Sequence, residues 1–493
     1  MGKATLLLPF DNTYAHDLEG FYVPWRPATV PAPRLLLFNQ ALAEELGLDS
    51  AALDTDLGAR IFSGNQIPEE AHPLAQVYAG HQFGQFSPQL GDGRALLLGE
   101  VIDRHGRRRD MQLKGSGRTP FSRGGDGKAA LGPVLREYVI GEAMHALGVP
   151  TTRALAAVAT GEIIHRETPL PGAILTRIAA SHIRIGTFQY FAARNENAKI
   201  KQLADYTIAR HYPALENTGN PYLDLFAAVS AAQAALVARW MLVGFIHGVM
   251  NTDNMSIAGE TIDYGPCAFM DAYDPNTVFS SIDVQGRYAY ARQPQIAQWN
   301  LTRFAETLID LVSPDPEEAV RLLTEQVNAF PKLYAHHWLK GMRAKIGLST
   351  AEEDDLALVQ TLLSAMEDQR ADYTLVFRHL SAALRGDEAQ VRTHFADPTR
   401  FDLWLPQWKA RLARESLPAE LCAEAMDRVN PIYIPRNHKV EEALAAATNA
   451  QDFAPFKTLL DVLAQPFEER PGWEDHAQPA PESFGPFKTF CGT

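Results

Sequence analysis

The sequence predicts an α+β protein in which a small β-rich lobe precedes a larger, mostly helical lobe. Residues 74–179 alternate short β-prone runs with glycine turns and contain one helix-like segment. From residue 224 onward, long segments repeat apolar residues with the helical period. The length of 493 residues also exceeds the ~250–300 residues at which single cores stop growing, so two or more packed units are expected.

The predicted elements divide the chain into four parts. Residues 1–70 are expected to pack as an extension on the core, 71–180 to form the small lobe, 181–465 the helical lobe, and 466–493 an extended tail rich in proline and aromatic residues. In the small lobe we expect two strands within 74–101, a strand ending at Lys114, a helix over 131–149, a hairpin over 153–168 that turns at Thr160-Gly161, and a strand over 172–179. In the helical lobe we expect helices over 224–248, 299–312, 316–330 and 355–368.

Composition narrows the function classes. The formal charge of −14 argues against a nucleic-acid-coating surface, and the longest apolar run is interrupted by Arg239 and His247, as in a buried helix rather than a membrane span. The N-terminus lacks a targeting pattern, so we expect a cytoplasmic protein, and we expect a monomer. Cys267, Cys422 and Cys491 are too few for a disulfide scaffold and form no C-x-x-C pair, which argues against structural zinc.

Two glycine-rich stretches are candidates for phosphate binding. In "QLGDGR", Gly91 and Gly93 let backbone N–H groups approach phosphate and Arg94 adds charge, although a plain hairpin turn explains them equally well. In "KGSGRTPFSRGGDGK", a Walker A reading fails at both ends, where Ser122 and Ala129 stand. What remains is a flexible loop that carries Arg123, Asp126, Gly127 and Lys128.

Lys114, at the end of a predicted strand, is placed like a kinase lysine that grips phosphate and pairs with a helix glutamate. Glu137 and Glu142 are both candidates for the partner, and the apolar stripe of the helix favours Glu142. Arg177 and Arg184 follow the last strand of the small lobe, where two arginines suit a phosphate grip, or else solvent-facing or interlobe ion pairs.

The strongest motif is "HGVMNTDNMSIAGETIDYGP", residues 247–266. It has the spacing of a kinase catalytic loop followed by Asp-aromatic-Gly, with Asn254 and Asp263 as hard oxygen ligands suited to Mg²⁺. Val249 stands where the kinase base belongs, so Asp253 is the only candidate base in this loop. A small β-rich lobe followed by such a loop is also the layout of a protein kinase.

These motifs, together with "NPIYIPRNHKVEEAL" and a cysteine third from the C-terminal end, resemble the selenoprotein O family over nearly the whole chain. The resemblance implies a protein-kinase-like fold that binds ATP in a flipped orientation and transfers AMP to Ser, Thr or Tyr hydroxyls of other proteins. It implies Mg²⁺, or alternatively Mn²⁺, on Asn254 and Asp263, with Asp253 as base and Glu137 as the partner of Lys114. The nucleotide contacts that it implies are Gly91, Gly93, Arg94, Lys114, Asp126, Gly127, Arg177, Arg184 and Asp263.

The resemblance also draws attention to the cysteines, because family members carry selenocysteine or cysteine near the C-terminus. Cys491 takes that place here, and Cys267 follows Asp263 by four residues. We hypothesise a regulatory Cys267–Cys491 disulfide, with two unrelated thiols as the alternative.

Three functions are compatible with these motifs. An adenylyltransferase is favoured by Val249 and by the resemblance, and an ordinary phosphotransferase with Asp253 as base is the alternative. A non-catalytic nucleotide-binding scaffold is disfavoured because Lys114, Asn254 and Asp263 are all present.

Overall fold

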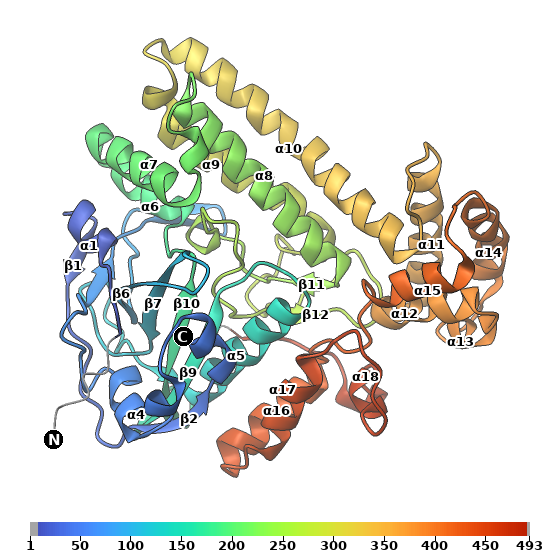
Figure 1. Ribbon diagram of the computed structural model, residues 1–493, viewed down its shortest axis with the longest axis horizontal. Coiled ribbons are helices and arrows are strands. Elements are labelled where there is room, and N and C mark those ends of the chain that lie inside the picture. Colours follow the sequence, from blue (N-terminus) through green and yellow to red (C-terminus); the bar gives the residue numbers. More distant parts are fainter. Residues whose placement is uncertain (1–7, 491–493) are drawn as a thin grey trace.

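The computed structural model describes residues 8–490, which form an α+β structure built around an eight-stranded antiparallel sheet (Figure 1). The strand order is β1-β3-β6-β7-β10-β9-β2, and β8 pairs with β10. The α+β prediction is therefore confirmed. The strands are β1 (Tyr22–Pro24), β2 (Arg34–Phe38), β3 (Leu74–Gln76), β6 (Ala95–Ile102), β7 (Arg108–Lys114), β8 (Ala129–Ala130), β9 (Arg153–His165) and β10 (Pro169–Ala179).

The two faces of the sheet are covered by different helices. On β7, Met111 and Leu113 pack with the core residues of α2 (Gln40–Glu45), α3 (Ser50–Leu53) and α4 (Asp56–Phe62). Because side chains alternate along a strand, Gln112 and Lys114 point to the other face, which α5 (Leu131–Ala146) covers. The period-2 pattern thus directs the polar side chains of β7 toward α5.

The strand register brings Lys114 and Arg177 onto this same face. Lys114 pairs with Ala95 of β6 on one side and with Leu175 of β10 on the other, and Gln112 pairs with Arg177. Residues directly opposite in an antiparallel pair point to the same side of the sheet. The guanidinium of Arg177 accordingly donates to Gln112 Oε1 at 2.6 Å.

The predicted turn at Thr160-Gly161 is wrong. Strand β9 runs through both residues, and its register with β10 shifts between Pro171 and Ala173, as at a β-bulge. Gly161, with φ of 77°, supplies the left-handed conformation that a bulge favours. The chain instead turns at Arg166–Thr168, where the Arg166 N–H donates to the Thr168 carbonyl.

The C-terminal half is helical. Helices α8 (Pro221–Leu242), α9 (Gln293–Val312) and α10 (Pro316–Lys345) pack against one another (Figure 1). Helix α8 ends earlier than predicted because Gly244 adopts a φ of 72° and Phe245–Ile246 pair as β11 with β12 (Ala268–Phe269). The other helices are α1 (Thr13–Asp17), α6 (Ile185–Ala192), α7 (Asn197–His211), α11 (Asp355–Gln369), α12 (Tyr373–Leu384), α13 (Glu388–Arg392), α14 (Thr399–Leu412), α15 (Ala419–Asp427), α16 (Asn437–Asn449), α17 (Ala454–Leu463) and α18 (Glu474–Ala477).

Among residues 8–490, α8 alone is long and apolar enough to cross a membrane by length and composition. In its most apolar window, 61% of the residues are buried inside the protein. It therefore has the character of a core helix, as the sequence predicts.

A buried polar network joins the sheet to the first helices after it. Asp110 of β7 accepts hydrogen bonds from the His182 backbone N–H (2.8 Å), pairs with His182 Nδ1 (3.0 Å) and contacts Arg210 of α7. Arg210 also donates to the Ala180 carbonyl at 2.6 Å. Burial lowers the pKa of His182 to about 4, although Asp110 opposes the shift, and burial lowers the pKa of His211 to about 3.

This network predicts a loss of stability in mild acid. His182 stays neutral in the folded protein but takes up a proton in the unfolded chain below its ordinary pKa of about 6.5. Acid therefore favours unfolding, and between pH 8 and pH 5 His182 alone is expected to lower the free energy of unfolding by about 2 kcal/mol. Urea titrations at several pH values in this range measure how steeply the free energy of unfolding falls with pH. His182→Gln should weaken this pH dependence, whereas His165→Gln, at an exposed position, should leave it unchanged. An equal pH dependence of the free energy of unfolding in wild type and His182→Gln would contradict the assignment of this effect to His182.

Candidate active site

A cavity of about 900 Å³ opens between the α5 face of the sheet and the loop 247–266. It is within the usual size range for a site that binds a small molecule. Among its lining residues are most of the charged and polar side chains singled out from the sequence: Arg94, Lys114, Glu137, Arg177, Arg184, Asp253, Asn254 and Asp263.

Lys114 lies at the centre of an ion cluster. Its Nζ is 2.6 Å from Glu137 Oε2 on α5 and 2.9 Å from Asp263 Oδ1. Arg177 Nη1 contacts the same two residues, at 3.1 Å from Glu137 Oε1 and 2.6 Å from Asp263 Oδ1. Glu137, rather than Glu142, is thus the helix partner of Lys114.

Glu142 has other partners. Its carboxylate accepts two hydrogen bonds from the Arg153 guanidinium, at 2.8 and 2.7 Å, and one from the Asn39 amide at 2.8 Å. The apolar-stripe argument for Glu142 as the Lys114 partner is wrong, because Arg153 of β9 and the Asn39 amide already bind the Glu142 carboxylate.

Arg184 adds a third cation to Asp263. Its Nη1 is 3.0 Å from Asp263 Oδ2 and donates to the Asp253 carbonyl at 2.7 Å, and its guanidinium lies 4.4 Å from the ring centre of Tyr78. Three cations therefore face two carboxylates, Glu137 and Asp263. Three fixed cations grouped beside a cavity suit a polyanion such as a triphosphate.

The three cations fix the ionisation of Asp263. Burial would raise the pKa of this carboxyl, but the charges of Lys114, Arg177 and Arg184 outweigh burial and hold the pKa well below its usual range. Asp263 also adopts a φ of 62°, a left-handed conformation that costs a non-glycine residue about 1–2 kcal/mol. Such strain is typical of residues whose placement serves a site.

The loop 247–266 is held from beneath by buried polar contacts. His247 is fully buried, its Nε2 lies 3.0 Å from the Ile262 carbonyl, and its backbone N–H donates to Gln293. Asn254 closes the 3₁₀ turn Thr252–Asn254, and its Nδ2 donates to the Val249 carbonyl at 2.9 Å. The position that holds a base in kinases thus supplies a carbonyl that orients Asn254.

Asp253 is a buried carboxyl with one oxygen left over. Its side chain is 7% exposed, its Oδ2 accepts a long hydrogen bond of 3.4 Å from Gln82 Nε2, and no described residue donates to its Oδ1. Burial raises its pKa to about 6, against the charge of Arg184. A carboxyl that lines a cavity and whose pKa is raised by burial is suited to accept a proton.

The short hairpin β4 (Gly80–Gln82) and β5 (Gln85–Ser87) packs over this loop. The His81 N–H donates to Thr252 Oγ1 at 2.7 Å, and the Phe83 N–H donates to Asn251 Oδ1 at 3.0 Å. The hairpin leaves so little room that a Cβ on Gly80 would overlap Asp253 Oδ1.

Gly80→Ala is therefore expected to displace the Asp253 carboxyl and to lower kcat about tenfold, because a small displacement of a reacting group slows catalysis. The measurement is kcat beside the melting temperature. Gly219→Ala is the matched control, since a Cβ there meets nothing within 4 Å. Equal kcat for Gly80→Ala and wild type would show that this close contact does not position Asp253.

The oxygen atoms at the cavity fit a magnesium ion. Because the amide nitrogen of Asn254 is bonded to Val249, its Oδ1 is the atom left to bind a cation, and Asp263 adds a permanently ionised carboxylate. The described residues contain no cluster of three or more His, Cys, Asp or Glu side chains able to hold a metal. Two protein ligands agree with a Mg²⁺ that takes its remaining ligands from water and phosphate.

The glycine-rich stretches are divided between the cavity and its support. Gly93 and Arg94 line the cavity, whereas a Cβ on Gly91 would overlap the Phe121 ring. Gly127 is packed as closely, against the Gly117 carbonyl. Asp126 is exposed and makes two hydrogen bonds to Arg166, at 2.8 and 2.9 Å, and it is not among the lining residues.

Among the further lining residues that did not emerge from the sequence are Tyr78, Gln82, Asp92 and Phe487. Asp92 lies between the two glycines of the "GDGR" motif, accepts from the Gln76 backbone N–H at 3.1 Å, and has its pKa raised to about 6 by burial. The "GDGR" motif, which contains Asp92, could therefore have identified this residue from the sequence. The other three are brought to the cavity only by contacts between distant segments.

Comparison with known proteins agrees with this chemistry. Residues 4–464 match the family model described as "Protein adenylyltransferase SelO". A protein of Cereibacter sphaeroides named "Protein nucleotidyltransferase YdiU" is 64% identical over 98% of this chain and 99% of its own length. A protein of Rhizobium meliloti with the same name is 59% identical over the same shares of the two chains. The chain therefore belongs to the SelO family of protein adenylyltransferases and is a nucleotidyltransferase.

Proposed function

We propose that the protein transfers AMP from ATP to Ser, Thr or Tyr hydroxyls of other proteins. The observation that carries this proposal is the convergence of Lys114, Arg177 and Arg184 on Asp263 in a cavity that Asp253 also lines. The family membership supports the same reaction. ATP is the nucleotide, Mg²⁺ or alternatively Mn²⁺ the metal, and Asn254 and Asp263 its protein ligands.

The positions of the cations support a proposed place for the phosphates. Lys114 and Arg177 lie deep on the sheet, where they suit the terminal phosphates, and Asp253 lies in the catalytic loop, where it suits the acceptor. A nucleotide bound in the flipped orientation would place its α-phosphorus beside Asn254 and Asp253. Fixed charges in a buried site then stabilise the pyrophosphate that leaves.

The chemical step needs one proton acceptor. The acceptor oxygen attacks the α-phosphorus, the bond between that phosphorus and the oxygen bridging to the β-phosphate breaks, and the hydroxyl proton passes to Asp253. A metal held by Asn254 and Asp263 would supply charge neutralisation on the phosphate oxygens. The Asp253 carboxylate, which lines the cavity, is the group proposed to receive the proton.

The proposal includes a protein-kinase-like, two-lobed arrangement, with the parts 1–70, 71–180, 181–465 and 466–493 assigned above. This arrangement is supported by the ion pair between Lys114 on the strand and Glu137 on the helix, and by Asp263 beside that pair. The segment before residue 70 also contributes β1 and β2 to the sheet. A cytoplasmic monomer without nucleic-acid or membrane partners remains part of the same proposal.

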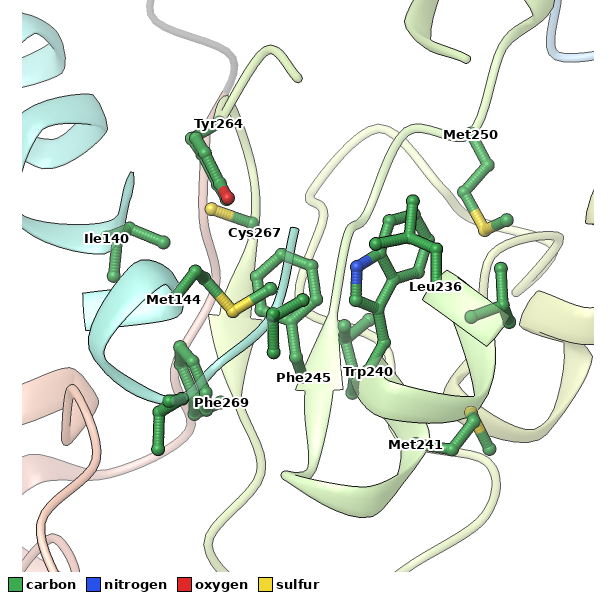
Figure 2. Packing of buried hydrophobic residues seen from close by; sticks show 14 of the residues in the cluster. Ile140, Met144, Leu236, Trp240, Met241, Phe245, Met250, Tyr264, Cys267 and Phe269 are labelled. Atoms are coloured by element: carbon green, nitrogen blue, oxygen red, sulfur yellow. The ribbon is translucent and has the colours of Figure 1, made fainter. Parts of the chain in front are cut away.

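Redox control of the site is a further part of the proposal. Cys491 lies outside the described residues, but Thr489 donates its hydroxyl to the carbonyl of Pro266, the neighbour of Cys267. Figure 2 shows Cys267 beside Tyr264, with Met144 and Phe269 nearby, and burial raises its pKa to about 12. Its thiol must therefore be uncovered before it can exchange. Peptide mapping without reductant tests the Cys267–Cys491 disulfide, and free thiols under oxidising conditions would exclude it.

One labelling experiment tests the reaction. The protein is incubated with Mg²⁺ and ATP labelled at either the α- or the γ-phosphate, and the label bound to protein is measured. We expect label from the α-position only. Label from the γ-position would show phosphate transfer instead, and no label from either would exclude transfer to protein.

A further inference from the structure

The C-terminal tail forms one wall of the active-site cavity. Phe484, Pro486, Phe487, Lys488, Thr489 and Phe490 all line the same cavity as Lys114 and Asp263. Thr489 fixes this segment, because its N–H donates to the Phe279 carbonyl at 2.8 Å and its carbonyl accepts from the Ser281 N–H at 2.9 Å. The cavity is therefore complete only when the tail is in place.

The cavity has a charged end and an apolar end. Leu131 and Glu137 both line it from α5, and six residues of α-helix span about 9 Å. Glu137 belongs to the ion cluster, whereas the first turn of α5, at Leu131, is level with α16, since a Cβ on Gly132 would lie 3.7 Å from Thr448 Cγ2. The apolar lining residues from these segments are Leu131, Val134, Leu170, Leu444, Ala445 and Phe487, and the charged residues Arg136, Glu441 and Lys488 line the cavity beside them.

Phe487 is held as part of an aromatic group. Its ring is stacked on Phe484 with centroids 5.5 Å apart and is tilted against Phe279 at 5.8 Å. The side chain is half-buried and faces the cavity on its remaining surface. A fixed ring with an open side can pack against a flat aromatic ligand.

We infer that the apolar end binds the base of the nucleoside triphosphate and that the tail supplies Phe487 as a packing surface for that base. The inference rests on the proposed function, because the ion cluster must hold the phosphates. A nucleotide is then gripped at both ends, by charge at Lys114, Arg177 and Arg184 and by apolar contact at Phe487. Because the favourable free energy of apolar contact grows with the area buried, purine nucleotides should bind more tightly than pyrimidine nucleotides.

Two substitutions act on this end in opposite ways. Phe487→Ala removes the packing surface, and Ala445→Trp adds bulk from an exposed position on α16 that lines the cavity. Isothermal titration with ATP, and separately with inorganic tripolyphosphate, is carried out in the presence of Mg²⁺. Phe487→Ala should raise the Kd of ATP about threefold to tenfold and leave that of tripolyphosphate unchanged, because a lost aromatic contact is worth about that much. Ala445→Trp should likewise weaken ATP alone.

Trp473→Ala is the matched control, since Trp473 lies in the tail region and packs on Arg470 at 3.6 Å outside the cavity. The subsite is refuted if Phe487→Ala weakens the binding of ATP and of tripolyphosphate equally, or leaves both Kd values unchanged. It is also refuted if the variant binds ATP more tightly, because the tail would then obstruct the cavity. Failure of wild type to bind tripolyphosphate would refute it as well. Failure of the proposed function is distinguishable, because ATP would then show the expected binding changes without transfer of the α-label.

Discussion

Asp263→Ala is expected to abolish AMP transfer, with a fall in kcat of about 10³-fold or more. Asp263 is the carboxylate on which Lys114, Arg177 and Arg184 converge, so its removal takes one carboxylate partner from three cations at once. It is also one of the two proposed metal ligands. The measurement is incorporation of α-labelled AMP into protein under single-turnover conditions.

The binding of ATP separates this effect from unfolding. Without Asp263 the three cations remain available for phosphate, so the Kd of ATP should change far less than kcat. Asp461→Ala, at an exposed position on α17, is the control for loss of an aspartate. Transfer at the wild-type rate by Asp263→Ala would refute the assignment of this residue.

Local patterns predicted the parts of the site that depend on local geometry. Strand alternation accounts for Lys114 on the face of the sheet that α5 covers. Arg177, expected after the last strand of the small lobe, lies instead within β10 and reaches the same face through its register with β7. The spacing of the loop 247–266 identified Asn254, Asp253 and Asp263, all of which line the cavity. These residues follow from short-range periodicity, which a single sequence contains.

What the sequence did not predict depends on contacts between distant segments. Glu142 lies on the apolar stripe of its helix, but its carboxylate accepts hydrogen bonds from Arg153 and Asn39, which come from other parts of the fold. Asp126 carried a phosphate-loop pattern, yet its carboxylate is bonded to Arg166. Phe487 reaches the cavity only because Thr489 pairs with residues 279–281. Neither competition between partners nor the path of a tail leaves a periodic signal.

Asp253→Asn is expected to lower kcat by about 10²- to 10⁴-fold, the range for loss of a general base, with little change in the Kd of ATP. The substitution keeps the shape of the side chain. It also keeps the backbone carbonyl that Arg184 bonds, so the loop should hold its conformation. What disappears is the negative charge of the carboxylate that lines the cavity, and with it the ability of this side chain to accept a proton.

Asp92 makes this experiment decisive, because it is a second buried carboxyl at the cavity whose pKa is also raised to about 6 by burial. The two differ in their partners. Asp92 Oδ2 is bonded to the Gln76 backbone and lies 3.3 Å from Gln112 Nε2, on the sheet side, whereas Asp253 stands in the loop beside Asn254. Asp92→Asn should therefore act mainly on ATP binding and Asp253→Asn on kcat. The reverse result would assign the base to Asp92, and a large loss of kcat in neither variant would mean that the hydroxyl gives up its proton without a protein carboxylate.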